Sequence, residues 1–366
     1  MQTQNINKCS DNNNKKRIVQ MSFSRLQSVL MRQRLALFVI TLFTLNLSQW
    51  GVADAPIPAE IAPKASQSLL IDITRAGDNY VVVGERGHIL VSEDKGQSWQ
   101  QATVPVNVML NAVHFVDEIT GFAAGYDGHI IQSIDSGKTW TLVRNGLSAQ
   151  AEMNAKAFQQ AKQKVGELEE QLAQPELPSS DELMLKEALD EAQWQLDSAK
   201  DKLDSAIVAS PILDIWFSDR NNGWVVGAFG TVLKSSDGGA TWNDHRANVP
   251  NEMEFHLNAV SGLADGSVVI AGEAGFVAVS NDQGVSFTLA DLGYEGTVFD
   301  VKASPSGHQL VATGLRGKTF IAGTDLFNWT DITPDVGFSL AGLTFMTDDQ
   351  FLLVGHGGTL ALSNDN

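Results

Sequence analysis

GWVVGAFGTVLKSSDGGATW, residues 223–242, contains two short motifs that return along the chain. The first is a Gly-x-x-Gly turn at Gly227 and Gly230, and the second is the octapeptide SSDGGATW that follows it. Related octapeptides are SEDKGQSW at 92–99, SIDSGKTW at 133–140 and SNDQGVSF at 280–287. The first glycines of six such turns, at 84, 125, 227, 272, 314 and 355, lie 41, 102, 45, 42 and 41 residues apart. A period of about 42 residues with several short strands is typical of β-propeller blades.

Each repeat shows four short strand patterns, most clearly at 110–115, 121–125, 129–133 and 139–143. We therefore predict an all-β fold, a six-bladed β-propeller, with a seven-bladed one as the alternative. The six units span 69–106, 107–145, 210–250, 255–292, 296–333 and 338–366. Because the last unit has no fourth strand, we expect residues 55–66 to pair with it and close the ring. The three prolines of that segment fit an edge strand.

One insertion, at 148–207, interrupts the repeats. Apolar residues recur at helical spacing over 153–172 and again over 185–203, where the steps alternate between four and three as in a coiled coil. Two prolines separate the segments. We predict an antiparallel helical hairpin that projects as an arm, with a capping box at Ser179 opening its second helix.

Residues 1–53 have the features of an export signal. A basic segment at 31–34 precedes an apolar stretch at 35–47, and small residues at 51–53 offer a cleavage site. The stretch is shorter than the about 20 residues of an ordinary spanning helix. We predict a periplasmic location, with an uncleaved membrane anchor or secretion as alternatives. The expected organisation is a leader at 1–53, propeller at 54–147, the arm at 148–207 and propeller at 208–366.

The composition excludes several classes of function. The net charge is -18, and the leader holds few of the acidic residues, so the exported part repels nucleic acid. The one cysteine, Cys9, lies in the leader, which leaves neither a disulfide-linked partner nor a thiol nucleophile. No spacing of histidines or aspartates is typical of zinc or calcium sites, and we predict no metal and no cofactor.

The octapeptide has the pattern of the Asp-box, and its chemistry is local. Its carboxylate can accept N–H groups of its own turn, its glycine permits unusual backbone angles, and its final aromatic ring can pack on outer strands. The same motif occurs in glycosidases, away from the catalytic centre. We therefore assign a structural role to its aspartates, which are Asp94, Asp135, Asp237 and Asp282.

The motif at 223–242 resembles that of the photosystem II stability and assembly factor family of β-propellers. The resemblance covers about 69–366 outside the arm. It implies a non-catalytic assembly factor that holds membrane proteins while a complex is built. Two features depart from the photosynthetic members: they have seven blades where we count six units, and the arm is not carried over from them.

The residues between the paired glycines differ from unit to unit, whereas the framework repeats. Since propellers place recognition on varied side chains of a repeated frame, these are candidate partner-binding residues, although solvated turn residues would show the same variation. The arm joins two blades on the same side as these turns, and two aromatic residues outside its apolar seam extend the candidate surface. The candidates are Glu85, Arg86, Tyr126, Asp127, Phe229, Glu273, Arg316, His356, Phe158 and Trp194.

A carbohydrate-active propeller, either a sialidase-like glycosidase or a lectin, is the alternative function. Sialidase chemistry needs three arginines and a tyrosine paired with a glutamate, and here the turns offer Arg86, Arg316 and Tyr126 with Glu85 or Glu273. Because two arginines are too few, we predict a non-enzymatic scaffold. Its expected partner is an envelope or inner-membrane protein complex, either a transporter or a complex under assembly.

Overall fold

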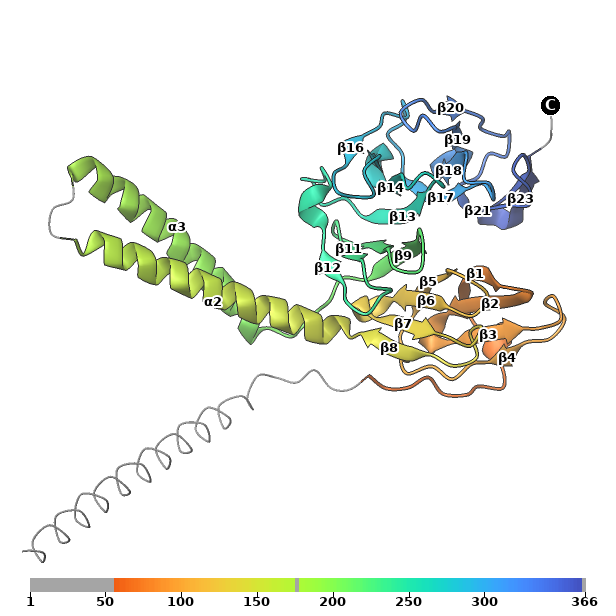
Figure 1. Cartoon of the computed structure of the whole chain (residues 1–366), viewed down its shortest axis with the longest axis horizontal. Helices are drawn as coiled ribbons and strands as arrows, with labels where there is room; N and C mark the ends of the chain where they lie inside the picture. Colours follow the sequence, from red (N-terminus) through yellow and green to blue (C-terminus); the bar gives the residue numbers. More distant parts are fainter. Residues whose placement is uncertain (1–55, 175–177, 364–366) are drawn as a thin grey trace, which may run out of the picture. The chain divides into compact units, whose positions relative to one another are not determined.

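The computed structural model describes residues 56–174 and 178–363, so the predicted leader and its cleavage site lie outside the described residues. The described part of 53–366 is mostly β, with six small antiparallel sheets and two long helices (Figure 1). The first strand of each sheet contacts the first strand of the next sheet in chain order.

Strands follow one another within each sheet in chain order. Sheet 1 contains β1 (Leu70–Ala76), β2 (Asn79–Gly84), β3 (Ile89–Ser92) and β4 (Gln100–Gln101). Sheet 2 contains β5 (Leu110–Phe115), β6 (Gly121–Gly125), β7 (Ile130–Ser133) and β8 (Thr141–Arg144). Sheet 3 contains β9 (Ile212–Phe217), β10 (Gly223–Gly227), β11 (Val232–Ser235) and β12 (Asn243–Asp244).

Sheet 4 contains β13 (Leu257–Gly262), β14 (Val268–Gly272), β15 (Val277–Ser280) and β16 (Thr288–Leu289). Sheet 5 contains β17 (Val298–Ala303), β18 (Leu310–Gly314), β19 (Thr319–Ala322) and β20 (Thr330–Asp331). Sheet 6 contains β21 (Leu340–Phe345), β22 (Phe351–Gly355) and β23 (Thr359–Leu362). Each Gly-x-x-Gly turn joins the second strand of its sheet to the third.

The first position of each turn must be glycine because a side chain would have no room there. A Cβ on Gly84 would lie 2.1 Å from the carbonyl oxygen of Leu69, the residue just before β1, and the same clash recurs at 2.1–2.3 Å in all six described sheets. That carbonyl accepts the N–H of Glu85 at 3.0 Å, and its counterparts accept the N–H of the residue after each first glycine. The backbone of Gly84 is extended, with φ at -173°, so the close approach rather than a left-handed angle demands glycine.

Side chains of the first strands bind successive sheets together. Asp72 of β1 accepts the N–H of Val113 in β5 at 2.8 Å, and Asn111 of β5 donates to the carbonyl of Ile212 in β9 at 2.7 Å. The alternation continues with Asp214, Asn258 and Asp300 at 2.8–2.9 Å. Every one of these strands has a bulge at its second residue. Each is also an edge strand of its sheet, so its outward backbone groups are free to bond with the neighbouring sheet. We call these five side chains the inter-sheet latches.

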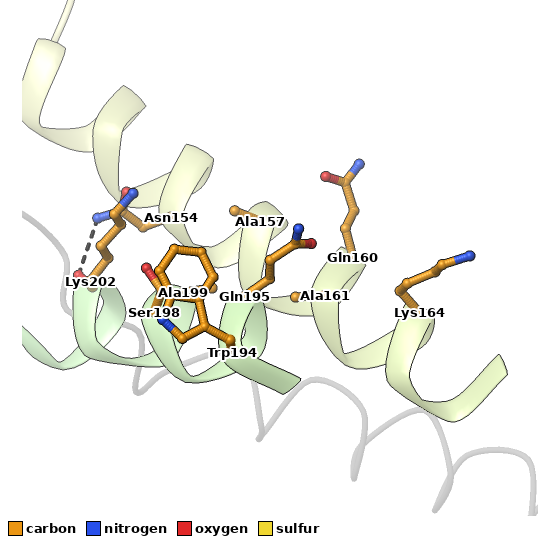
Figure 2. Close-up of a pocket in the computed structure, with 10 residues that line it drawn as sticks. All are labelled: Asn154, Ala157, Gln160, Ala161, Lys164, Trp194, Gln195, Ser198, Ala199 and Lys202. Carbon is orange, nitrogen blue, oxygen red and sulfur yellow. Dashed lines mark hydrogen bonds between the residues drawn. The ribbon is translucent and has the colours of Figure 1, made fainter. Parts of the chain in front are cut away.

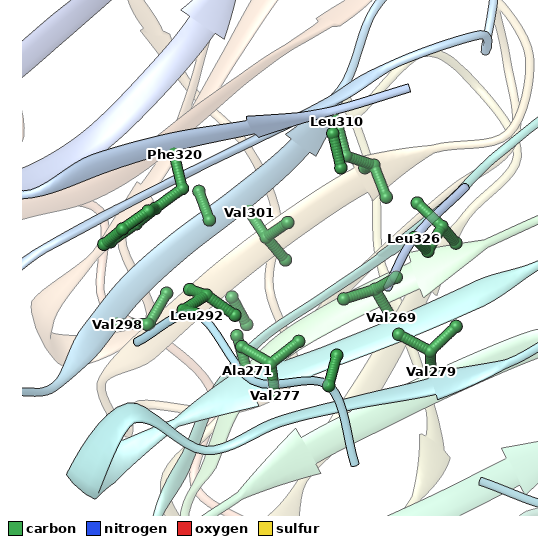
Figure 3. Packing of buried hydrophobic residues seen from close by; sticks show 14 of the residues in the cluster. Val269, Ala271, Val277, Val279, Leu292, Val298, Val301, Leu310, Phe320 and Leu326 are labelled. Carbon is green, nitrogen blue, oxygen red and sulfur yellow. The ribbon is translucent and has the colours of Figure 1, made fainter. Parts of the chain in front are cut away.

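Apolar residues of neighbouring sheets form shared cores. Figure 3 shows one of them, in which Val269 and Val277 of sheet 4 pack with Val301, Leu310 and Phe320 of sheet 5. The second strands of sheets 2 to 5 are apolar on both sides because each lies between two sheets; all five residues are buried in β6, β10, β14 and β18.

The expected ring closure is wrong for the described residues. Ala59 donates its N–H to the carbonyl of Val104 at 3.0 Å, so the proline-containing segment follows the outer edge of sheet 1 instead of completing sheet 6. Sheet 6 keeps three strands. Ile73 of β1 is 57% exposed, whereas its counterparts in the other five sheets are buried against the preceding sheet. No described sheet therefore covers this face of sheet 1.

The Asp-box aspartates bond within their own turns. Asp135 accepts the N–H and the hydroxyl of Thr139 at 2.9 and 2.6 Å and the hydroxyl of Ser133 at 2.8 Å. Trp140 donates its indole N–H to the carbonyl of Gly137 at 2.9 Å. The same side-chain bonds recur at Asp94, Asp237 and Asp282.

Two helices, α2 (Gly146–Leu172) and α3 (Ser179–Asp204), occupy the insertion and pack against each other. Their shared core holds Val165, Leu168 and Ala192, with three leucines of α3 packed against it. The predicted capping box is wrong, because α3 begins at Ser179 itself with Pro178 as the N-cap residue and no side-chain cap bond. We call α2 and α3 together the arm.

Alanine at Gly227 should destabilise the protein, because its Cβ would lie 2.2 Å from the carbonyl oxygen of Pro211. Overpacking of this kind costs about 1–3 kcal/mol of unfolding free energy. Gly323 is the matched control, since a Cβ there meets nothing within 4 Å. Urea unfolding followed by tryptophan fluorescence measures both variants; equal midpoints for Gly227→Ala and Gly323→Ala would contradict the assignment.

Candidate functional site

The Gly-x-x-Gly turns and the octapeptides lie at opposite ends of the strands. Each turn joins strands two and three of its sheet, and each octapeptide joins strands three and four, so antiparallel pairing separates them by one strand length. We call the residues between the paired glycines the turn rim. They are Glu85 and Arg86, Tyr126 and Asp127, Ala228 and Phe229, Glu273 and Ala274, Leu315 and Arg316, and His356 and Gly357.

The base of the arm is fixed to the second turn. A Cβ on Gly146 would lie 2.1 Å from the carbonyl oxygen of Asp127. Gly146 donates its N–H to Nδ1 of His129 at 3.2 Å, and Arg144 donates to the carbonyl of Gly128 at 2.5 Å. The arm therefore begins on the same side of the sheets as the turn rim.

Five turn-rim residues adopt a left-handed backbone that L-residues disfavour. The second position between the glycines has φ of 54–61° in five turns, and only the sixth turn places a glycine there. A non-glycine residue in this conformation costs roughly 1 kcal/mol. The five residues are Arg86, Asp127, Phe229, Ala274 and Arg316.

Two of the candidate rim residues meet at one histidine. The ring of Phe229 lies edge-on to His256 with centroids 4.9 Å apart, and it is 58% exposed. Glu273 accepts the backbone N–H of His256 at 2.9 Å. Together they form an exposed patch across sheets 3 and 4. His256 precedes β13, outside the turns, and no repeat pattern singles it out.

The sialidase-like set is not assembled. Glu85 accepts the N–H of Leu69, and Arg316 donates its backbone N–H to the hydroxyl of Ser339 at 3.1 Å. Within residues 56–174 and 178–363, no hydrogen bond joins Tyr126 to Glu85 or to Glu273, because these carboxylates bond to the backbone N–H groups of Leu69 and His256.

The arm presents an exposed tryptophan beside a groove. Trp194 is 67% exposed and lines a cavity of about 470 Å³ between α2 and α3 (Figure 2), whereas Phe158 is half-buried and does not line it. In the described part of the chain, no helix is long and apolar enough to cross a membrane.

A charged cluster between the first strands was not predicted. The ammonium group of Lys302 in sheet 5 lies 3.3 Å from Asp300 and 4.0 Å from Asp214, which belongs to sheet 3. The charge of the same lysine acts to lower the pKa of Asp72 in sheet 1 and of His114 in sheet 2. The sequence does contain a pattern that indicates this cluster, because aspartate stands at the third residue of the first strand in alternate repeats. We call these five residues the inner cluster.

Burial dominates the electrostatics of the inner cluster. Burial raises the pKa of Asp214 to about 6, although Lys302 opposes this rise. It also raises the pKa of Asp72 and lowers that of His114 to about 4. The three carboxylates raise the pKa of Lys302 despite its burial, so the lysine stays charged. Among the described residues, no three acidic, histidine or cysteine side chains are placed to hold a metal ion.

A model of the family described as photosynthesis system II assembly factor YCF48 matches residues 2–134 and 190–296, more than half of the chain. The chain belongs to the Ycf48 family. The photosystem II assembly lipoprotein Ycf48 of Synechococcus sp. (strain CC9902) is 34% identical over 86 residues, 24% of this chain and 25% of that relative. The photosystem II assembly protein Ycf48 of Thermosynechococcus vestitus is 42% identical over 50 residues, 14% of each chain.

The chain thus aligns with a quarter or less of the length of these relatives. A solved structure, "YCF48 bound to D1 peptide", has a TM-score of 0.52 and 16% identity, and the match covers 84% of this chain and 85% of that one. This likeness shows a propeller-like fold shared with the Ycf48 family.

Protonation of Asp214 should stabilise the protein between pH 6 and pH 4. The folded state takes up this proton near pH 6, while an unfolded aspartate does so near its ordinary pKa of about 3.9. In that window the folded state holds the Asp214 proton and the unfolded state does not, so the contribution of Asp214 to the free energy of unfolding rises as the pH falls, opposite in sign to the contribution of His114, whose pKa is lowered. Asp214→Asn should reduce this rise while keeping an acceptor for Val260.

Asp237→Asn is the control. Hydrogen bonds from Thr241 hold the pKa of Asp237 below its ordinary value, so its contribution is lost only below about pH 4. Urea unfolding at pH 4, 5, 6 and 7 measures both slopes. An unchanged slope between pH 6 and 4 in Asp214→Asn would refute the assignment.

Proposed function

We propose that this chain is a non-catalytic assembly factor that holds a membrane protein complex through the turn rim and the arm. The varied side chains of the turn rim carry the proposal. Octapeptide residues such as Lys95 and Gln283 have the same left-handed backbone, so the strain is common to both ends of the strands. The rim differs in that its side chains change from sheet to sheet and that the arm begins on its side, which supports a role in binding.

Family membership supports the class of partner. The family is described as an assembly factor, and one solved member is bound to a D1 peptide. We therefore propose a segment of a membrane protein as the ligand of the turn rim. The comparisons give no support to a transporter as the partner.

The location follows from the same relatives. Curated members from cyanobacteria are named lipoproteins, which supports export or membrane association for this chain. The basic and apolar segments at 31–47 support export to the periplasm by a signal peptide.

The exposed face of sheet 1 supports the seven-bladed alternative for the propeller. Six sheets leave Ile73 of sheet 1 and Leu360 of sheet 6 largely exposed, and a further blade between these sheets would cover apolar residues of this kind. We propose the arm as a coiled-coil hairpin inserted between the second and third blades. The carbohydrate-active alternative is not favoured, because its residues are not brought together.

The double variant Arg86→Gly/Arg316→Gly tests the proposal. Both residues are exposed and left-handed, so glycine should leave the free energy of unfolding unchanged or raise it by about 1 kcal/mol. Recovery of a membrane complex from detergent-solubilised membranes with the tagged protein should fall at least tenfold. Deletion of 148–206 should also reduce recovery.

Lys95→Gly/Gln283→Gly is the matched control. These two residues are also exposed and left-handed, with φ of 62° and 59°, but they lie in octapeptides at the opposite end of the strands. They should gain the same stability and keep full recovery. Equal recovery of the membrane complex with both double variants would refute binding through the turn rim. If the protein hydrolysed a fluorogenic sialoside and only Arg86→Gly/Arg316→Gly abolished this activity, the carbohydrate-active function would be established instead.

A further inference from the structure

We propose that the groove between α2 and α3 binds an α-helix of the partner that carries two carboxylates about three turns apart. The proposal rests on the proposed function and names the chemistry that the arm recognises. The groove has a volume of about 470 Å³ and contains the most exposed tryptophan of the described residues.

The floor of the groove fits a third helix. Ala157 and Ala161 of α2 lie one turn apart and face Ala199 of α3, so small side chains line both walls. Small residues allow another helix backbone to approach closely. Figure 2 shows the indole of Trp194 between the two helices, where it offers a large apolar contact.

The ends of the groove are positively charged in an otherwise acidic arm. Helices α2 and α3 contain twelve acidic residues and six lysines, yet no acidic side chain lines the groove. Lys164 and Lys202 do line it, at opposite ends in Figure 2. Neither ammonium group has a salt-bridge partner in the part of the chain that the structure describes. This distribution is complementary to a helix with acidic residues.

The register of the helices sets the spacing of the carboxylates. Asn154 donates to the backbone carbonyl of Lys202 at 3.2 Å, which places these two residues at the same level. Lys164 lies ten residues further along α2, or about 15 Å at 1.5 Å per residue. On a partner helix the same length is ten to eleven residues, close to three turns, so both carboxylates lie on one face.

Charge reversal with two designed peptides tests this proposal. One peptide is an amphipathic 18-residue helix with a leucine face and two glutamates eleven residues apart; its twin has lysines at those two positions. Fluorescence anisotropy with the full chain should show at least tenfold tighter binding of the acidic peptide. Lys164→Glu/Lys202→Glu should reverse the preference, and Trp194→Ala should weaken both peptides.

Lys156→Glu/Lys200→Glu is the matched control, because these exposed lysines stand on the same helices but do not line the groove. It should keep the preference for the acidic peptide. Equal binding of both peptides, or the same reversal in the control, would overturn the proposal. The proposal would also be overturned if neither peptide bound while the protein bound anionic phosphatidylserine vesicles, and if only Lys164→Glu/Lys202→Glu abolished that vesicle binding. The groove would then be assigned to a membrane surface.

The peptide result and the recovery of a membrane complex are independent. If deletion of 148–206 or Arg86→Gly/Arg316→Gly reduces recovery while the peptides fail to discriminate, the proposed function stands and the acidic-helix groove fails. If the peptides discriminate but neither change affects recovery, the assembly role fails while the groove remains a binding site.

Discussion

A main-chain carbonyl occupies the place where the first glycine of every turn would carry a side chain. Because the oxygen of Leu69 and its counterparts also accept the next N–H of the turn, each first strand begins at a fixed register against its own turn. Each first strand is also the edge of its sheet, and the latches bond to outward backbone groups of the first strand in the next sheet. The carbonyl contact also fixes the turn-rim residue two places later, so the fold and the turn rim share one origin.

The two ends of the strands differ in how their turns are held. At one end, Asp-box carboxylates satisfy their own turns and leave little free hydrogen-bonding capacity. At the other end, turns such as that of Arg86 carry backbone strain and varied side chains. Between them lies the inner cluster, in which Lys302 is 3.3 Å from Asp300 and 4.0 Å from Asp214 and the nearby carboxylates raise the pKa of the lysine. Left-handed non-glycine residues stand at both ends, as Arg86 and Lys95 show, so the two ends differ in the variety of their side chains and not in backbone strain.

Much of this architecture follows from the sequence, because glycines and octapeptides repeat in place. The period predicts the sheets, and the helical spacing at 153–172 predicts α2. The latches follow from the sequence only in part: the aspartates recur at the third residue of alternate first strands, but the intervening repeats use asparagine at the second residue, as at Asn111, so a single repeated position does not reveal the whole set. The sequence also does not predict which sheet edge the proline-containing segment joins, because Ala59 could pair with any free edge and no residue pattern distinguishes one edge from another.

The position of the groove explains why an arm and a rim suit one partner. The groove begins at Asn154, eight residues after Gly146, which rests on the turn that contains Asp127. Eight helical residues span about 12 Å, so a membrane protein could contact the rim with one segment and the groove with another. Two weak contacts held at a fixed separation bind more tightly than either alone, and each can still be released in turn. Such release is what an assembly factor requires, because it must leave the complex once assembly is complete.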